Sequence, residues 1–168
     1  MKQIRRKSHR PGAGFTLLEA MIAMVIIGLT IAALVTSSGA FSRTNAAGID
    51  LSTAEFLIEE VREMTAAVAV VDPQTGTATF GPEAGETVAQ YDDLDDFDGA
   101  TFSPPIDIER ADLNDFAAFT QRITVDNVSV SDLTQVVAAH SSDFVRVTVD
   151  ILMNGRTISS CSWVRTRY

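Results

Sequence analysis

The chain has 168 residues, of which 46% are hydrophobic, and carries a formal net charge of −9 at pH 7, so it holds one modest domain plus a hydrophobic segment. Five of the 13 basic residues precede Phe15, whereas all 22 acidic residues follow it. This acidic body argues against nucleic-acid binding, which needs cations to neutralise phosphates. It also argues against docking of the globular part on anionic lipid.

Residues 15–35 form an apolar run whose only charge is Glu19. A helix of this length measures about 31 Å, close to the hydrocarbon thickness of a bilayer. Basic residues cluster before the run, and Arg43 is the only one soon after it. The positive-inside bias therefore predicts a single-pass protein with a cytoplasmic N-terminus and an extracytoplasmic C-terminal domain.

A secretory signal peptide is the first alternative for this segment. Such a peptide would be cut after its apolar core, at Ala32-Ala33 or within residues 38–40. Two features disfavour this interpretation: the apolar run is long for a signal peptide, and it contains a carboxylate.

The string Gly14-Phe15-Thr16-Leu17-Leu18-Glu19 follows a short basic leader. It resembles the prepilin processing site of type IV pilins and of type II secretion pseudopilins. The resemblance covers residues 10–35. It implies that a membrane-embedded aspartyl peptidase, the prepilin peptidase, cuts after Gly14 on the cytoplasmic side and methylates the new N-terminus at Phe15. It further implies a bacterial inner-membrane location, other pilin or pseudopilin subunits as partners, and an inner-membrane assembly platform.

Glu19 then has a predicted role in assembly. Cleavage leaves a cationic amine on Phe15, and packed helices can place that amine beside the Glu19 carboxylate of a neighbour. A buried ion pair adds little net stability, but it fixes axial register, because a slipped neighbour leaves a charge unpaired. The alternative is a tolerated charge whose side chain reaches toward the membrane interface.

Residues 36–72 are expected to continue the helix, with a soft bend near Gly39 because glycine and hydroxyl residues have low helix propensity. Residues 51–68 show the three- and four-residue spacing of an amphipathic helix. Pro73 is expected to end it. The predicted apolar stripe consists of Leu51, Ala54, Leu57, Ile58, Val61, Met64 and Val68.

Residues 73–168 are predicted to form an extracytoplasmic, β-rich domain. Short strands are expected at residues 75–80 and 121–130. Alternation over residues 144–164 around Asn154-Gly155 predicts a hairpin with a type I′ turn. The expected fold class is α+β, a small antiparallel sheet packed on the amphipathic half of a long helix, which is also the pilin fold that the resemblance implies.

Residues 83–115 contain eleven acidic residues and one base, Arg110. Calcium prefers clustered oxygen ligands, although Leu94 breaks the spacing of an EF-hand loop. A non-EF calcium site and a solvated acidic surface loop whose aspartates cap turns both remain open. The candidate calcium ligands are Asp92, Asp93, Asp95, Asp96 and Asp98.

We expect no catalytic activity and no required cofactor. Residues 140–143 contain His, Ser and Asp, but adjacent residues rarely meet in the geometry of a catalytic triad. Near the C-terminus, Trp163, Arg165 and Tyr168 are expected to complete the last strand or to dock a partner.

The predicted function is a structural subunit of a type IV pilus-like filament, a minor pilin or a minor pseudopilin of type II secretion. The lone Cys161 excludes the disulfide pair of many major pilins. The alternative is a single-pass, membrane-anchored binding module whose acidic loop takes calcium.

Overall fold

The computed structural model describes residues 14–167. The predicted leader, residues 1–14, therefore lies outside the described residues except for Gly14, and so does Tyr168. The chain divides into two units between Ala46 and Ala47, which we describe separately. The elements are α1 (Leu17–Ala67), η1 (Asp95–Phe97), β1 (Thr101–Phe102), η2 (Asn114–Phe116), β2 (Phe119–Asn127), β3 (Phe144–Met153) and β4 (Arg156–Thr166).

In the first unit, α1 exposes every side chain up to residue 46. The helix continues without interruption through residues 36–39, where a soft bend near Gly39 was expected. Within this stretch the Thr36 hydroxyl donates to the carbonyl of Ala32, at 2.9 Å.

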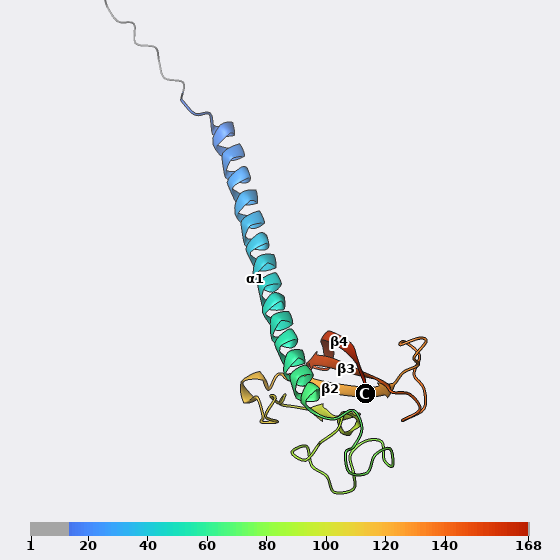
Figure 1. The fold of residues 1–168 in the computed structure, drawn as a ribbon. Helices are drawn as coiled ribbons and strands as arrows, with labels where there is room; N and C mark the ends of the chain where they lie inside the picture. The colour runs from blue at the N-terminus through green and yellow to red at the C-terminus, as the bar shows by residue number, and fades with distance from the viewer. Residues whose placement is uncertain (1–13, 168) are drawn as a thin grey trace, which may run out of the picture. The chain divides into compact units, whose positions relative to one another are not determined.

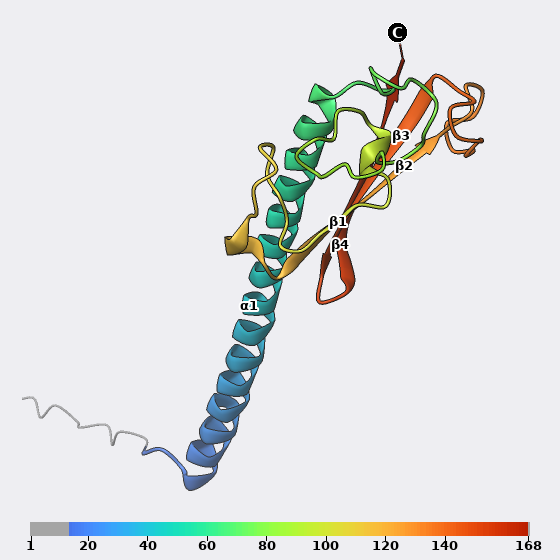
Figure 2. The same cartoon turned by 90° about the horizontal axis from the view of Figure 1, so that it is seen from below.

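In the second unit, residues 47–67 of α1 pack on an antiparallel sheet of order β1-β2-β3-β4 (Figures 1 and 2). The predicted α+β class is confirmed. The core contains five apolar side chains of the helix and alternate side chains of β2 and β3. Leu94 and Phe97, from the segment between α1 and β1, also enter it. Its main members are Ala54, Leu57, Ile58, Val61, Met64, Leu94, Phe97, Ile123, Val125, Val147, Val149 and Ile151.

The buried helix stripe matches the prediction from Ala54 to Met64, but Leu51 is 47% exposed and lies outside the core. The helix also ends at Ala67, before Pro73. Two contacts replace the next helical turn. Arg165 Nη1 donates to the carbonyls of Thr65 and Val68. The Ala69 amide donates to the backbone carbonyl of Asp92, at 3.2 Å.

The predicted hairpin is confirmed by the pairing of β3 with β4. Asn154 and Gly155 both have positive φ, 52° and 75°, as a type I′ turn requires. β2 ends at Asn127, and Val130 beyond it is 72% exposed.

The strand predicted at residues 75–80 is wrong. Residues 72–76 form a turn in which the Asp72 carboxylate accepts bonds from the Gln74 amide, from the Thr75 amide at 2.9 Å and from the Thr75 hydroxyl at 2.7 Å. These bonds hold the pKa of Asp72 down at about 2, with the Thr75 amide as the largest cause. The Asp-Pro turn chemistry therefore overrides the β propensity of the threonines.

A buried side chain that the periodicity did not single out joins the helix to the sheet. Gln121 of β2 is fully buried, and its amide donates to the carbonyls of Leu57 and Ile106, both at 3.1 Å, while its carbonyl accepts from the Ile106 amide at 2.8 Å. All three bonds are needed because a buried amide without partners is costly.

Candidate functional site

The segment around the predicted cleavage point lies outside the helix. Gly14, Phe15 and Thr16 precede the first helical residue, Leu17, and all three are exposed. A Cβ built on Gly14 would have no atom within 4 Å. Nothing in the described part of the chain therefore requires glycine at this position, and a requirement for it would come from outside the chain.

Thr16 occupies the N-cap position of α1. Its carbonyl accepts the first helical hydrogen bond, from the Ala20 amide at 3.2 Å, and its hydroxyl oxygen accepts from the Glu19 amide, also at 3.2 Å. The second contact satisfies one of the amides that a helix N-terminus leaves without an intrahelical partner. Thr16 was missed as a functional residue, although the Thr-x-x-Glu spacing of a capping box was readable in the sequence.

Glu19 lies in the first turn of α1, and its side chain is exposed. A negative charge is favourable at this end of a helix, because the peptide dipoles leave the N-terminus positive. No ion pair to Glu19 forms within residues 14–167. Its partner in the expected assembly would come from a second subunit.

The apolar run is uncovered in the structure. Large side chains from Phe15 (82% exposed) to Val35 (68% exposed) face outward on all sides of α1. Of the described residues, α1 is the one helix long and apolar enough to cross a membrane. The Thr30 hydroxyl within this run donates to the Ile27 carbonyl at 2.8 Å, so that it adds no unpaired donor in an apolar environment.

The five candidate calcium ligands lie in one loop, but they are mostly engaged in holding its backbone. Asp96 accepts from the Asp92 and Asp93 amides at 3.0 and 3.2 Å, and Asp93 accepts from the Asp96 amide at 3.2 Å. Asp95 accepts from the Gly81 amide at 3.0 Å, and Asp98 accepts from the Val125 amide at 2.9 Å. The remaining candidate, Asp92, accepts from the Gln74 side chain at 3.1 Å.

The expected role of the aspartates as turn caps agrees with these bonds, but the expected solvent exposure is wrong for the centre of this segment. Asp93, Asp95 and Asp96 are each at most 4% exposed, and they flank the buried side chains of Leu94 and Phe97. The two apolar residues anchor the loop in the core and draw the carboxylates in with them. The aspartates are therefore structural acceptors, rather than a solvated surface.

Burial changes the protonation of this loop. Desolvation, followed by a hydrogen bond with the Asp95 side chain, raises the pKa of Asp93 to about 8. Burial is also the largest cause of the raised pKa of Asp96. Asp93 thus carries a proton near neutral pH, which lets it lie beside Asp95 without two full charges meeting.

A different set of carboxylates comes close enough to share a cation. Oxygens of Glu83, Glu86 and Asp96 lie within 4.8 Å of one another. Only Asp96 belongs to the predicted ligands. Burial is the largest cause of the raised pKa of Glu83, and Asp72 adds to it. The sequence segment was acidic throughout, so nothing in it singled out this trio.

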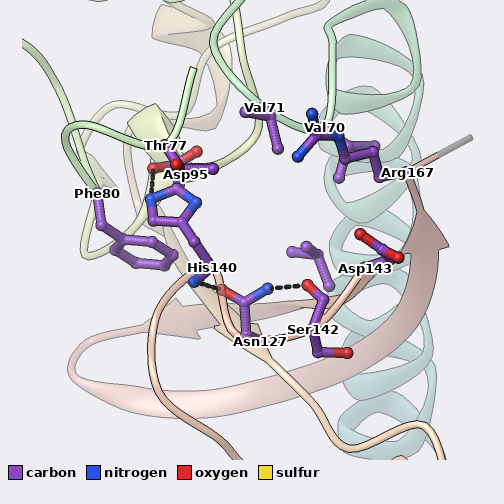
Figure 3. A pocket seen from close by; sticks show the side chains of 11 residues that line it. Val70, Val71, Thr77, Phe80, Asp95, Asn127, His140, Ser142, Asp143 and Arg167 are labelled. Carbon is purple, nitrogen blue, oxygen red and sulfur yellow. Dashed lines mark hydrogen bonds and ion pairs between the residues drawn. The ribbon is translucent and has the colours of Figure 1, made fainter. Parts of the chain in front are cut away.

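His140 lines a small hollow beside the acidic loop (Figure 3). Its ring nitrogen Nε2 lies 2.8 Å from the Thr79 carbonyl and 3.8 Å from Asp95, and the ring packs edge-on against Phe80. The hollow has a volume of about 20 Å³, the space of about one water molecule. Among the described residues no serine hydroxyl bonds this ring, so residues 140–143 do not form a triad.

The C-terminal candidates that the structure describes both pack on α1. The Arg62 guanidinium lies 5.0 Å from the centre of the Trp163 ring, and Arg165 bonds carbonyls at the end of the helix. Both side chains thus complete the last strand, as expected, while Tyr168 lies outside the described residues.

The protonated Asp93 predicts a specific pH dependence. Its ordinary pKa is 3.8, so the folded chain binds more protons than the unfolded chain between about pH 4 and pH 8, and stability falls as pH rises through that range. We expect Asp93→Asn, which keeps the shape and cannot ionise, to flatten this decline. The measurement is the urea midpoint of the full chain in mild detergent, followed by fluorescence of Trp163. The exposed Asp115→Asn is the matched control, and equal pH slopes for Asp93→Asn and the unaltered chain would contradict the assignment.

Residues 10–35 match the family model described as "Prokaryotic N-terminal methylation motif". Comparisons with curated proteins and with solved structures give no match. The matched stretch contains Gly14 and Phe15 outside the helix, the Thr16 cap, Glu19 in the first turn, and the uncovered apolar helix surface. This combination points to a structural subunit that assembles with others of its kind. Residues 10–35 are a type IV pilin-like prepilin segment.

Proposed function

We propose that the chain is a minor subunit of a type IV pilus-like filament, either a minor pilin or a minor pseudopilin of type II secretion. The observation that carries this proposal is the register of Gly14, Phe15 and Glu19 within the matched methylation motif. The prepilin peptidase cuts after Gly14 and methylates Phe15. The helix then holds the subunit in the bacterial inner membrane until the assembly platform moves it into the filament.

The orientation follows from charge. Residues 1–14 contain five basic and no acidic residues, which favours retention of the N-terminus in the cytoplasm and export of the acidic domain. The minor assignment is supported by the acidic segment and by the single cysteine, Cys161.

The mature protein is expected to begin at a methylated Phe15. We predict that Gly14→Ala slows cleavage strongly and that Gly14→Val abolishes it. Neither change should alter thermal unfolding, because a side chain at residue 14 meets nothing in the described chain. Mass spectrometry of the mature N-terminus tests this. A terminus within residues 37–40 would instead identify an ordinary secreted protein.

In the proposed filament, the Glu19 carboxylate pairs with the Phe15 amine of a neighbouring subunit and thereby fixes the axial register of the helices. We predict that Glu19→Gln reduces recovery in sheared filaments, or crosslinking to partner pilins, several-fold. Membrane insertion, cleavage and thermal unfolding should not change, because Glu19 lies outside the folded domain. Glu63→Gln, the same chemical change at an exposed position of α1 beyond the apolar run, is the matched control. Glu19→Lys is the harsher variant, since it brings two cations together, and normal filament recovery with it would refute the register role.

The second candidate function is a membrane-anchored module whose acidic loop binds calcium. The approach of Glu83, Glu86 and Asp96 within 4.8 Å favours it. Against it, the predicted ligands Asp93, Asp95, Asp96 and Asp98 already accept bonds from backbone amides. We therefore propose that the domain folds and assembles without a metal cofactor and without catalysis.

Calcium is expected to leave the melting temperature of the full chain in detergent unchanged. A site occupied at 100 times its dissociation constant would add about 2.7 kcal/mol, which such a measurement detects readily. A rise of several degrees that disappears in Glu86→Gln but persists in Asp115→Asn would establish the binding module instead.

A further inference from the structure

We propose that Thr16 is a positioning residue for processing: its hydroxyl keeps the Gly14–Phe15 bond outside α1, where a peptidase can reach it. The inference rests on the cleavage proposed above. It concerns a residue that neither forms the predicted scissile bond nor provides the charge for assembly.

The contact that carries this role is the hydrogen bond from the Glu19 amide to Thr16 Oγ1, at 3.2 Å. In an α-helix that extended upstream, the Glu19 amide would donate to the carbonyl four residues earlier, which belongs to Phe15. The Thr16 hydroxyl therefore takes the one donor that would draw Phe15 into the helix. The first carbonyl that accepts a helical bond is that of Thr16 itself, from Ala20 at 3.2 Å.

Such a stop matters because the surroundings of the helix favour extension. Amides and carbonyls without partners are costly in an apolar medium, so a membrane helix gains by adding turns at its end. Within a helix the Gly14–Phe15 bond would be shielded by neighbouring turns, and its carbonyl would be engaged. A cleavable bond needs a carbonyl that is free to be attacked, so the helix must begin after Gly14, and the cap at Thr16 meets that requirement.

Glu19 assists the same arrangement from its place in the first turn. Thr16 and Glu19 have the Thr-x-x-Glu spacing of a capping box, and the carboxylate offsets the positive end of the helix.

The test measures cleavage of the full chain in membranes that contain the prepilin peptidase, by mass spectrometry over time. Thr16→Val keeps the branched shape and removes the hydroxyl; we expect cleavage to slow about fivefold, as loss of a typical N-cap would produce. Thr16→Ser and Thr16→Asn keep a capping oxygen and should be cleaved at nearly the unaltered rate. Thr30→Val, the same substitution at a hydroxyl that bonds only within the helix, is the matched control.

Hydrogen exchange of the Glu19 amide in the uncleaved chain gives the second measurement. Exchange should be faster in Thr16→Val, but not in Thr16→Ser or Thr16→Asn. Cleavage of Thr16→Val at the unaltered rate would overturn the inference. Slow cleavage of Thr16→Asn with a protected Glu19 amide would also overturn it, because the peptidase would then be reading the hydroxyl directly. An unaltered chain that is never cleaved would refute the proposed processing itself, which is a different result.

Discussion

The folded domain depends on the contact between one stripe of α1 and the inner face of the sheet. Ala54, Leu57 and Val61 are fully buried there against alternate side chains of β2 and β3. Gln121 adds one hydrogen bond from the sheet to the helix, at the Leu57 carbonyl, and two more to Ile106 of the neighbouring loop. Because Leu94 and Phe97 enter the same core, the conformation of the acidic loop is a consequence of this contact.

The buried aspartates of the acidic loop, Asp93, Asp95 and Asp96, would repel one another and lose their hydration if all of them were charged. The chain avoids this by using carboxylates as acceptors for backbone amides and by keeping a proton on Asp93, whose pKa rises to about 8. A buried aspartate that stays neutral avoids the large cost of desolvating a charge. Much of this acidity therefore organises the backbone.

At the other end of α1, the proposed function gives a few residues successive roles. In that proposal, Gly14 and Phe15 are accessible before cleavage, and Phe15 and Glu19 meet a neighbouring subunit after it. Thr16 lies between the exposed residues Gly14 and Phe15 and the helix, which begins immediately beyond it. The exposed apolar surface of the run has no partner within its own unit, which is consistent with lipid or packed helices as its surroundings.

Local signals were sufficient for much of this protein. The apolar run, the N-terminal methylation motif, the helical stripe and the Asn154-Gly155 hairpin are each encoded within a short stretch, because periodicity and turn chemistry act over a few residues. Tertiary structure decided the rest. The helix ended at Ala67, and Arg165 and Asp92, remote in sequence, bond the residues directly beyond it, Val68 and Ala69. Asp93, Asp95 and Asp96 became buried because Leu94 and Phe97 joined a core made by distant strands. Burial and protonation depend on which distant residues come together, and composition alone does not contain that information.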